Sequence, residues 1–133
     1  MVSSLPLSPL KTNEPLSHHT YFKIGGPADF FFEAHTSSEL IQAVRVSLKY
    51  QLPYFVLGGG SNILVGDTGF RGLVIKNRTD SIRTLRPGLV EADSGTPLNK
   101  LVRYTIEESL SGLEAFLSVP GTIGGAIYNN SHY

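Results

Sequence analysis

The stretch that decides the fold is Tyr-Phe-Val-Leu-Gly-Gly-Gly-Ser-Asn-Ile-Leu-Val, which occupies residues 54–65. Its first four residues are aromatic, aliphatic or β-branched, and they predict a buried strand that ends sharply at Gly58. The three consecutive glycines lack a Cβ atom, so their backbone N–H groups can point into one concavity and approach an anion closely. Ser61 and Asn62 add short side chains that form hydrogen bonds. Such a loop would suit a diphosphate, and the alternative is a tight turn or bulge that requires positive φ.

The residues before this stretch predict a strand followed by a helix. Residues 30–34, Phe-Phe-Phe-Glu-Ala, form a short aromatic run that is typical of a strand. Thr36 and Glu39 stand three residues apart, as in a capping box, and apolar residues follow at helical spacing. A helix is therefore expected over about residues 37–50, with these residues on its apolar face: Leu40, Ile41, Val44 and Leu48. A strand, a helix and a strand in succession favour parallel pairing of the two strands through a right-handed crossover.

The residues after the glycines predict two more short strands and a second helix. Residues 73–75 and 89–92 are apolar runs beside turn residues, which indicates strands. Thr96 is expected to cap a helix that has Pro97 at its first position, where proline is best tolerated. Gly112 is the expected stop of this helix.

The composition is that of a globular chain without a strong charge. The chain has 133 residues, with 11 basic and 11 acidic side chains and no cysteine. A net charge of zero argues against an electrostatic grip on nucleic acid or anionic lipid. The lack of cysteine excludes disulfides, thiolate metal ligands and a thiol nucleophile. Because the sequence shows neither a secretory signal nor an apolar run near the roughly 20 residues of a membrane span, we expect a soluble cytoplasmic protein that binds neither nucleic acid nor membrane.

Glycine is the unusual residue, because eight of the 14 glycines fall into three clusters, at residues 25–26, 58–60 and 121–125. A Walker loop is excluded because the chain contains no Gly-Lys pair, and a dinucleotide fingerprint would need glycine in place of Ile63. Residues 120–126 form a second glycine-dense loop, whose surface would admit a planar ligand close to the main chain. The alternative there is close packing of one backbone against another. The joint occurrence of three clusters in so short a chain favours ligand binding.

Five segments together carry a family resemblance: residues 20–28, 56–65, 69–75, 110–114 and 120–126. The first segment reads Thr-Tyr-Phe-Lys-Ile-Gly-Gly-Pro-Ala, and the second contains Val-Leu-Gly-Gly-Gly-Ser-Asn. In this order they resemble the UDP-N-acetylenolpyruvoylglucosamine reductase family, flavoprotein reductases of murein precursor synthesis. The first segment matches the motif that opens the family's flavin domain, and the last two look like its second flavin-contacting stretch.

The resemblance implies an α+β fold, a two-lobed FAD-binding domain of the vanillyl-alcohol-oxidase (PCMH) type. A small parallel α/β lobe, expected over about residues 19–76, would pack on a second lobe with an antiparallel sheet over about residues 77–133. Residues 1–18 are rich in Pro and Ser and lack periodicity, so they would form a lead-in segment docked or frayed at the surface. The family continues well past this region, so the second lobe is expected to be incomplete and the substrate-binding domain absent.

The resemblance also implies that FAD lies in the cleft between the lobes and is held non-covalently. The triple-glycine loop would hold the pyrophosphate with backbone donors, and residues 120–125 would line the diphosphate and isoalloxazine side. Asn130 matches the family asparagine, but residues 129–133 lack the small Ala-Gly pair that follows it in the family. Lys23 stands where arginine is commoner, which keeps the charge and loses the bidentate fork. The expected cofactor-binding residues are Gly58, Gly59, Gly60, Ser61, Asn62, Pro120, Gly121, Thr122, Ile123, Gly124, Gly125 and Asn130.

The resemblance implies an FAD-dependent oxidoreductase of peptidoglycan synthesis, and with it a role in cell wall biogenesis, cell shape and cell division. NADPH would reduce the flavin, which would reduce UDP-N-acetylglucosamine enolpyruvate to UDP-N-acetylmuramate. The family's catalytic arginine, proton donor and glutamate lie beyond this region. No catalytic residue is therefore expected in this chain, and the UDP-sugar would bind only with the missing C-terminal region.

Two alternatives stay open beside this enzyme function. One is a non-catalytic flavin-binding module or truncated homologue, and the other is a related flavin oxidase domain that pairs with another subunit. The missing strands would leave part of a core uncovered, and a homodimer is one way to cover it.

Overall fold

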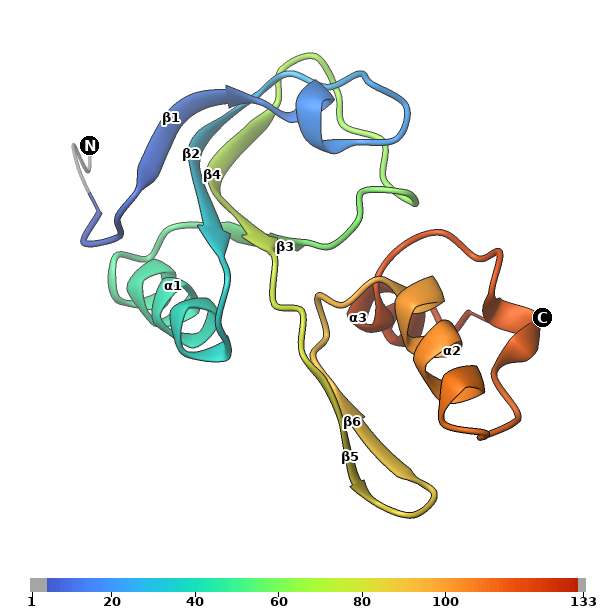
Figure 1. Cartoon of the computed structure of the whole chain (residues 1–133). Helices are drawn as coiled ribbons and strands as arrows, with labels where there is room; N and C mark the ends of the chain where they lie inside the picture. The colour runs from blue at the N-terminus through green and yellow to red at the C-terminus, as the bar shows by residue number, and fades with distance from the viewer. Residues whose placement is uncertain (1–4, 132–133) are drawn as a thin grey trace.

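The computed structural model describes residues 5–131, which form a four-stranded sheet and a two-stranded hairpin with helices beside each (Figure 1). The strand order of the sheet is β1-β2-β4-β3, and the hairpin pairs β5 with β6. The strands are β1 (Leu10–Pro15), β2 (Pro27–Ala34), β3 (Tyr54–Leu57), β4 (Phe70–Asn77), β5 (Ile82–Arg86) and β6 (Leu89–Ala92). The helices are α1 (Ser37–Lys49), α2 (Leu98–Glu107) and α3 (Ile123–Tyr128), with short 3-10 helices η1 (Leu16–His19) and η2 (Glu114–Phe116). This mixture of strands and helices confirms the α+β class.

Helix α1 confirms the strongest local prediction of the sequence. The Thr36 side chain accepts a hydrogen bond from the Glu39 backbone N–H at 3.1 Å, and the Glu39 carboxylate accepts one from the Thr36 N–H at 3.1 Å. This reciprocal capping box satisfies two donors that a helix start leaves without intrahelical partners. The helix therefore begins at Ser37, as its sequence indicates.

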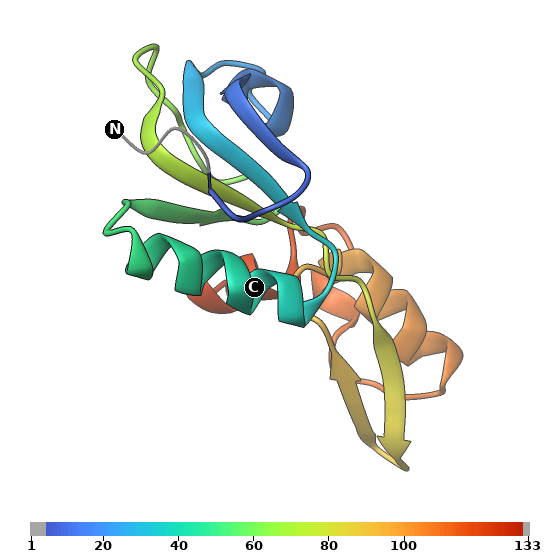
Figure 2. The ribbon, with the colours of Figure 1, turned by 90° about the vertical axis from the view of Figure 1, so that its left-hand side faces the viewer.

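The four-stranded sheet carries an apolar cluster on each face. On one face α1 packs along the sheet (Figure 2) and buries Phe32, Leu73 and Ile75. On the other face Phe31, Leu57 and Val74 form the second cluster, which η1 covers through Leu16. Adjacent residues of β2 and β4 thus point to opposite faces, as the pleat of a strand requires.

The strand order differs from the simple pairing that the sequence favours. Strands β2 and β3 run parallel, but each pairs with β4, which lies between them. Its central residues Leu73, Val74 and Ile75 are almost fully buried, because a strand in the middle of the sheet is covered by a neighbour on both sides and by apolar residues on both faces. The prediction of a parallel arrangement is right, and the prediction of direct pairing between the two strands is wrong.

Residues 54–57 form the predicted strand, but the prediction that this strand is buried is wrong. Strand β3 lies at the edge of the sheet, and Tyr54, Phe55 and Val56 are each about 40% exposed. Only Leu57, at its end, is buried. The opposite edge is β1, which pairs antiparallel with β2 and comes from residues 10–15, where the sequence shows no strand pattern.

The second part of the chain differs in detail from its prediction. Strand β6 is confirmed, but its partner β5 falls on residues that resemble an exposed loop; Arg83 and Glu91 join the two strands by an ion pair. Helix α2 begins one residue later than predicted, with Pro97 as its N-cap, because the Thr96 hydroxyl donates to the Ser81 carbonyl instead of capping. The helix ends at Glu107, ahead of the Gly112 stop that the sequence predicts.

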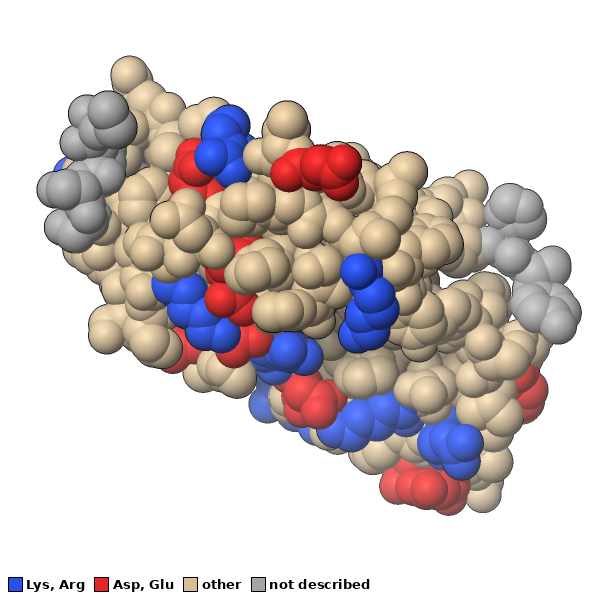
Figure 3. Space-filling model, turned by 90° about the horizontal axis from the view of Figure 1, so that it is seen from above, with Lys and Arg blue, Asp and Glu red and all other residues tan. Residues whose placement is uncertain are grey.

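The surface mixes charges of both signs, as the composition indicates. On the face seen in Figure 3, Lys and Arg side chains lie beside Asp and Glu side chains, and uncharged residues cover much of the rest. No helix within residues 5–131 has the length and apolar character needed to cross a membrane.

We expect Thr36→Ala to lower the free energy of unfolding by about 1 kcal/mol, because it removes the capping acceptor of α1. Urea denaturation monitored by circular dichroism measures this change. Ser38→Ala is the control, because Ser38 lies exposed in the same turn and its change should stay within about 0.5 kcal/mol. Equal losses in the two variants would contradict a stabilising role of the capping box.

Candidate functional site

The triple-glycine loop lies where three parallel strands end. Strands β2, β4 and β3 run in the same direction, and their registers place Glu33 beside Lys76 and Lys76 beside Leu57. Gly58 follows directly after Leu57. Ligands of open parallel sheets bind outside the carboxyl ends of the strands, so the sheet topology itself marks residues 58–62 as a candidate site.

The structure brings this loop against the second glycine-dense segment. An added Cβ atom on Gly58 would lie 2.6 Å from the Thr122 hydroxyl oxygen, and one on Gly59 would lie 3.1 Å from the Gly121 Cα atom. The Ser61 hydroxyl donates to the Pro120 carbonyl at 3.4 Å. The two segments are about 60 residues apart in sequence, and at Gly59 and Gly121 they contact each other through backbone alone.

Gly60 joins the third glycine-containing segment to the same place. Its φ is +75°, and an added Cβ atom would lie 2.2 Å from the His19 carbonyl oxygen. The Tyr21 N–H donates to the Gly60 carbonyl at 2.9 Å. Positive φ and close backbone packing, the alternatives considered for these clusters, are thus both present at the loop.

The close packing leaves backbone donors of the loop unused. Gly59 and Asn62 are exposed, and their N–H groups donate to no backbone carbonyl within residues 5–131. Tyr21 and Phe22, which follow the His19 contact, are 65% and 63% exposed. The loop therefore offers free N–H donors with aromatic surface next to them, a combination that suits an anion joined to flat rings.

The prediction that residues 120–126 form a loop is wrong beyond Thr122. Helix α3 begins at Ile123, and the Thr122 hydroxyl caps it by accepting from the Gly125 N–H at 3.3 Å. The N–H groups of Ile123 and Gly124 donate to the carbonyls of Thr96 and Ser94, so these two donors are already used inside the protein. The sequence suggested a loop because two adjacent glycines weaken a helix, which here is held by tertiary contacts.

The other predicted residues at this end have different surroundings. Pro120 is exposed, Gly121 has a φ of +117°, and Asn130 follows the end of α3 in the left-handed region with a φ of 48°. Asn130 is exposed. His132 and Tyr133, the last positions of the altered family pattern, lie outside the described residues.

A buried polar network that the sequence did not reveal holds the second segment in place. The Asn77 amide donates to the Ser94 hydroxyl at 2.9 Å, and its carbonyl oxygen accepts from the Thr79 hydroxyl at 2.9 Å. The Thr79 hydroxyl also accepts from the Gly95 N–H at 3.1 Å. Because Ser94 in turn accepts from Gly124, the network links the end of β4 to α3. The only hint of this network in the sequence is Gly95, one of the six glycines outside the three clusters.

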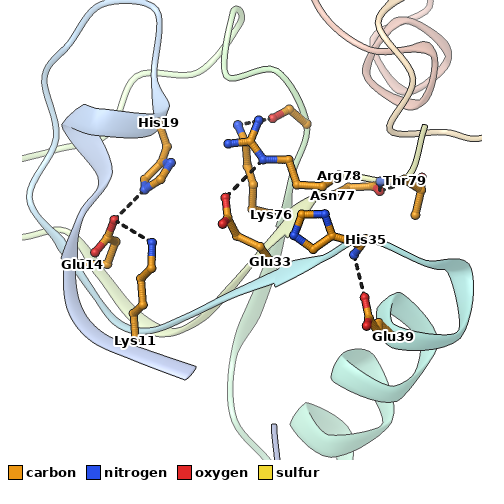
Figure 4. Close-up of polar contacts among 11 residues, drawn as sticks. Lys11, Glu14, His19, Glu33, His35, Glu39, Lys76, Asn77, Arg78 and Thr79 are labelled. Carbon is orange, nitrogen blue, oxygen red and sulfur yellow. Dashed lines mark hydrogen bonds and ion pairs between the residues drawn. The ribbon is translucent and has the colours of Figure 1, made fainter. Parts of the chain in front are cut away.

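Lys76 is the second feature that the sequence did not reveal. The residue is only 5% exposed, and its ammonium donates to the Gly58 carbonyl at 2.6 Å (Figure 4). Burial lowers the pKa of Lys76 to about 8; the nearby Arg78 guanidinium adds to this effect and the Glu33 carboxylate opposes it. An ammonium thus lies directly beneath the loop whose N–H groups are free.

Comparisons with known proteins agree with this geometry. The family described as FAD binding domain matches residues 28–133. The chain is 42% identical over 125 residues to a UDP-N-acetylenolpyruvoylglucosamine reductase of Carboxydothermus hydrogenoformans, with 93% of this chain and 41% of that protein covered. The protein of the same name from Geotalea uraniireducens is 42% identical over 123 residues, with 92% and 41% covered.

A solved structure extends the similarity to the fold. The crystal structure of UDP-N-acetylenolpyruvylglucosamine reductase from Thermus caldophilus superposes with a TM-score of 0.70 at 32% identity, over 90% of this chain and 41% of that one. The chain therefore spans about two fifths of the length of the curated relatives that it matches. The family resemblance stated from the motifs is confirmed.

We expect Gly60→Ala to destabilise the protein more than Gly88→Ala, although both glycines have φ near +75°. Gly88 has open space around its Cβ position, so its variant measures the left-handed strain alone, about 1 kcal/mol. At Gly60 the His19 carbonyl must also move, which adds roughly 2 kcal/mol. Urea denaturation of both variants measures the difference, and equal losses would contradict the tight contact at Gly60.

Proposed function

This chain belongs to the FAD binding domain family, and from that premise we propose that it holds the diphosphate of FAD on the backbone of residues 58–62. The observation that carries the proposal is the convergence of the glycine segments at the carboxyl ends of the parallel strands. There, Gly59 and Asn62 keep their N–H groups free beside the exposed rings of Tyr21 and Phe22. Had carbonyl groups of other elements accepted hydrogen bonds from these two N–H groups, the loop would have no donors left for a ligand.

The residues present fit such a group. A diphosphate needs N–H donors without side chains in the way, and both walls of the contact, at Gly59 and at Gly121, are bare backbone. Ser61 and Asn62 would add side-chain hydrogen bonds. We assign the second wall to Pro120, Gly121 and Thr122, with Ile123, Gly124, Gly125 and Asn130 contributing surface. FAD, when bound, would supply the hydride-transfer chemistry that these side chains lack.

We further propose that this chain is the flavin-binding part of an NADPH-dependent reductase that forms UDP-N-acetylmuramate from UDP-N-acetylglucosamine enolpyruvate. The support is the 42% identity to reductases of that name, of which the chain covers 41%. The proposal places the protein in the cytoplasm, in peptidoglycan precursor synthesis and thus in cell shape and division. It divides the chain into lobes near residue 76 and leaves the UDP-sugar to a region beyond the chain.

A non-catalytic flavin-binding module is the second candidate. The observation that favours it is the same coverage, because the chain matches only two fifths of each relative. A homodimer belongs to either proposal as a way to cover the exposed edge formed by Tyr54, Phe55 and Val56.

We expect FAD to bind the purified chain and to raise its melting temperature, because a ligand at 100 times its Kd adds about 2.7 kcal/mol of stability. Quenching of flavin fluorescence during titration measures the Kd. Gly59→Ala should weaken binding about tenfold or more, because its Cβ atom would push against Gly121. Gly66→Ala is the matched control, since nothing lies within 4 Å of its Cβ position. Absence of binding to the folded wild-type chain would refute the proposal.

We expect no NADPH consumption when the FAD-loaded chain alone is given the enolpyruvyl substrate, because no residue of the chain is assigned to catalysis. The control adds the separately produced C-terminal region of the Carboxydothermus relative. Turnover only in the mixture supports the reductase, whereas bound FAD without turnover in either case supports the non-catalytic module. Turnover by the chain alone would contradict both candidates.

A further inference from the structure

Lys76 has no acidic partner for its charge. Its ammonium donates to a neutral carbonyl, that of Gly58, and no ion pair of Lys76 is found within residues 5–131. Glu33, which faces it from β2 in the strand register, already pairs with Arg78 at 3.1 Å. Two cations and one carboxylate therefore leave one positive charge uncompensated at this edge of the sheet.

Keeping such a charge buried is costly. Removing an ammonium from water destabilises its charged form, and this is the cause of the lowered pKa of Lys76. A methionine or leucine would fill a buried strand position of β4 without that cost. The ammonium bonds the carbonyl of the peptide group that joins Gly58 to Gly59, and the N–H of that same group is the free donor of Gly59, which indicates a role for the charge at the loop.

Resting on the proposed function, we infer that Lys76 is a positioning residue that fixes the triple-glycine loop through Gly58 and supplies the positive charge that offsets the diphosphate of FAD. The ammonium acts through the Gly58 peptide: its hydrogen bond to the carbonyl polarises that peptide and orients the N–H of Gly59 toward the ligand.

The other charged groups near Lys76 on this face of the sheet have partners of their own. From β2 comes Glu33, and from the segment after β4 comes Arg78; these two pair with each other. From η1 comes His19, which stacks on Phe31 at 4.3 Å and bonds Glu14 of β1 at 2.8 Å. Lys11 of β1 also lies near Glu14 and over the Phe31 ring.

The test compares FAD with riboflavin, which has the flavin ring and no phosphate, on the purified chain. Lys76→Met should raise the Kd for FAD roughly 10- to 100-fold at pH 7, because it removes a charge close to the anion, and should leave the Kd for riboflavin within about twofold. The control Lys100→Met removes an exposed lysine that pairs with Asp80, and it should change neither Kd. Thermal melting checks that both variants are folded.

The pH dependence gives a readout that a purely structural role would not move. Lys76 loses its proton above about pH 8, and the anion favours the protonated form, so the wild-type affinity for FAD should fall by up to tenfold per pH unit above that value. Below pH 8 the affinity should be constant. The FAD affinity of Lys76→Met should not fall above pH 8, and Lys76→Arg, which keeps the charge, should retain its FAD affinity at pH 9.

The outcomes separate the two claims. If the wild-type chain binds FAD and Lys76→Met binds it equally well, or loses FAD and riboflavin to the same extent, the role of Lys76 is overturned while the proposed function stands. If the folded wild-type chain binds neither compound, the proposed function fails and the role of Lys76 fails with it. If Lys76→Met weakens the binding of FAD but not of riboflavin, and its FAD affinity no longer falls above pH 8, the charge of Lys76 contributes to FAD binding as proposed.

Discussion

The close approach of other chain segments to the backbone of Gly58, Gly59 and Gly60 is the constraint on which the rest of the structure depends. Gly58 and Gly59 bring the end of β3 against Thr122 and Gly121, and Gly60 brings it against the His19 carbonyl. A methyl group at any of these positions would meet another chain segment at about 3 Å or less. The sheet, the segment before β2 and the start of α3 therefore meet around one loop. They can do so because the glycines have no side chains to keep these segments apart.

The two sides of this loop are stabilised in different ways. The sheet side rests on apolar clusters on both faces of β4, whose central residues are almost fully buried. The α3 side has no buried apolar residue of its own and depends on polar contacts, from Asn77 through Thr79 and Ser94 to the Gly124 N–H. Buried polar groups are retained only when they are fully hydrogen-bonded, and no buried side-chain polar atom of the described residues lacks a partner. The α3 side of the contact is thus positioned by directional hydrogen bonds rather than by burial of apolar side chains.

Local sequence patterns predict the structure correctly where the stabilising interaction joins residues that are close in sequence. The capping box of Thr36 and Glu39 joins residues three apart, so the start of α1 could be predicted. The insertion of β4 between β2 and β3 depends on pairing between distant strands, and so does the exposure of β3 at the sheet edge; neither leaves a mark in residues 54–57 themselves. At the site, the triple-glycine loop could be predicted from composition and spacing, whereas the helix that begins at Ile123 could not. The role of Lys76 could not be predicted, because it follows the uninterrupted apolar run of residues 73–75, which does not show which face the next residue takes or what that side chain contacts.

The alternatives posed by the glycine clusters prove compatible with each other. Close packing and positive φ account for Gly60 entirely, and they account for Gly58 and Gly59 on the side that faces residues 121–122. The packing uses the space left by the absent side chains, and the hydrogen bonds within the protein go to the carbonyls of Gly58 and Gly60. The N–H groups of Gly59 and Asn62 are therefore left without internal partners. The carbonyls of Gly58 and Gly60 accept hydrogen bonds inside the protein, whereas the exposed Gly59 and Asn62 keep their N–H groups free, so the loop offers donors rather than acceptors to a ligand. The packing that looks like a purely structural explanation therefore also leaves free the donors on which the proposed anion site rests.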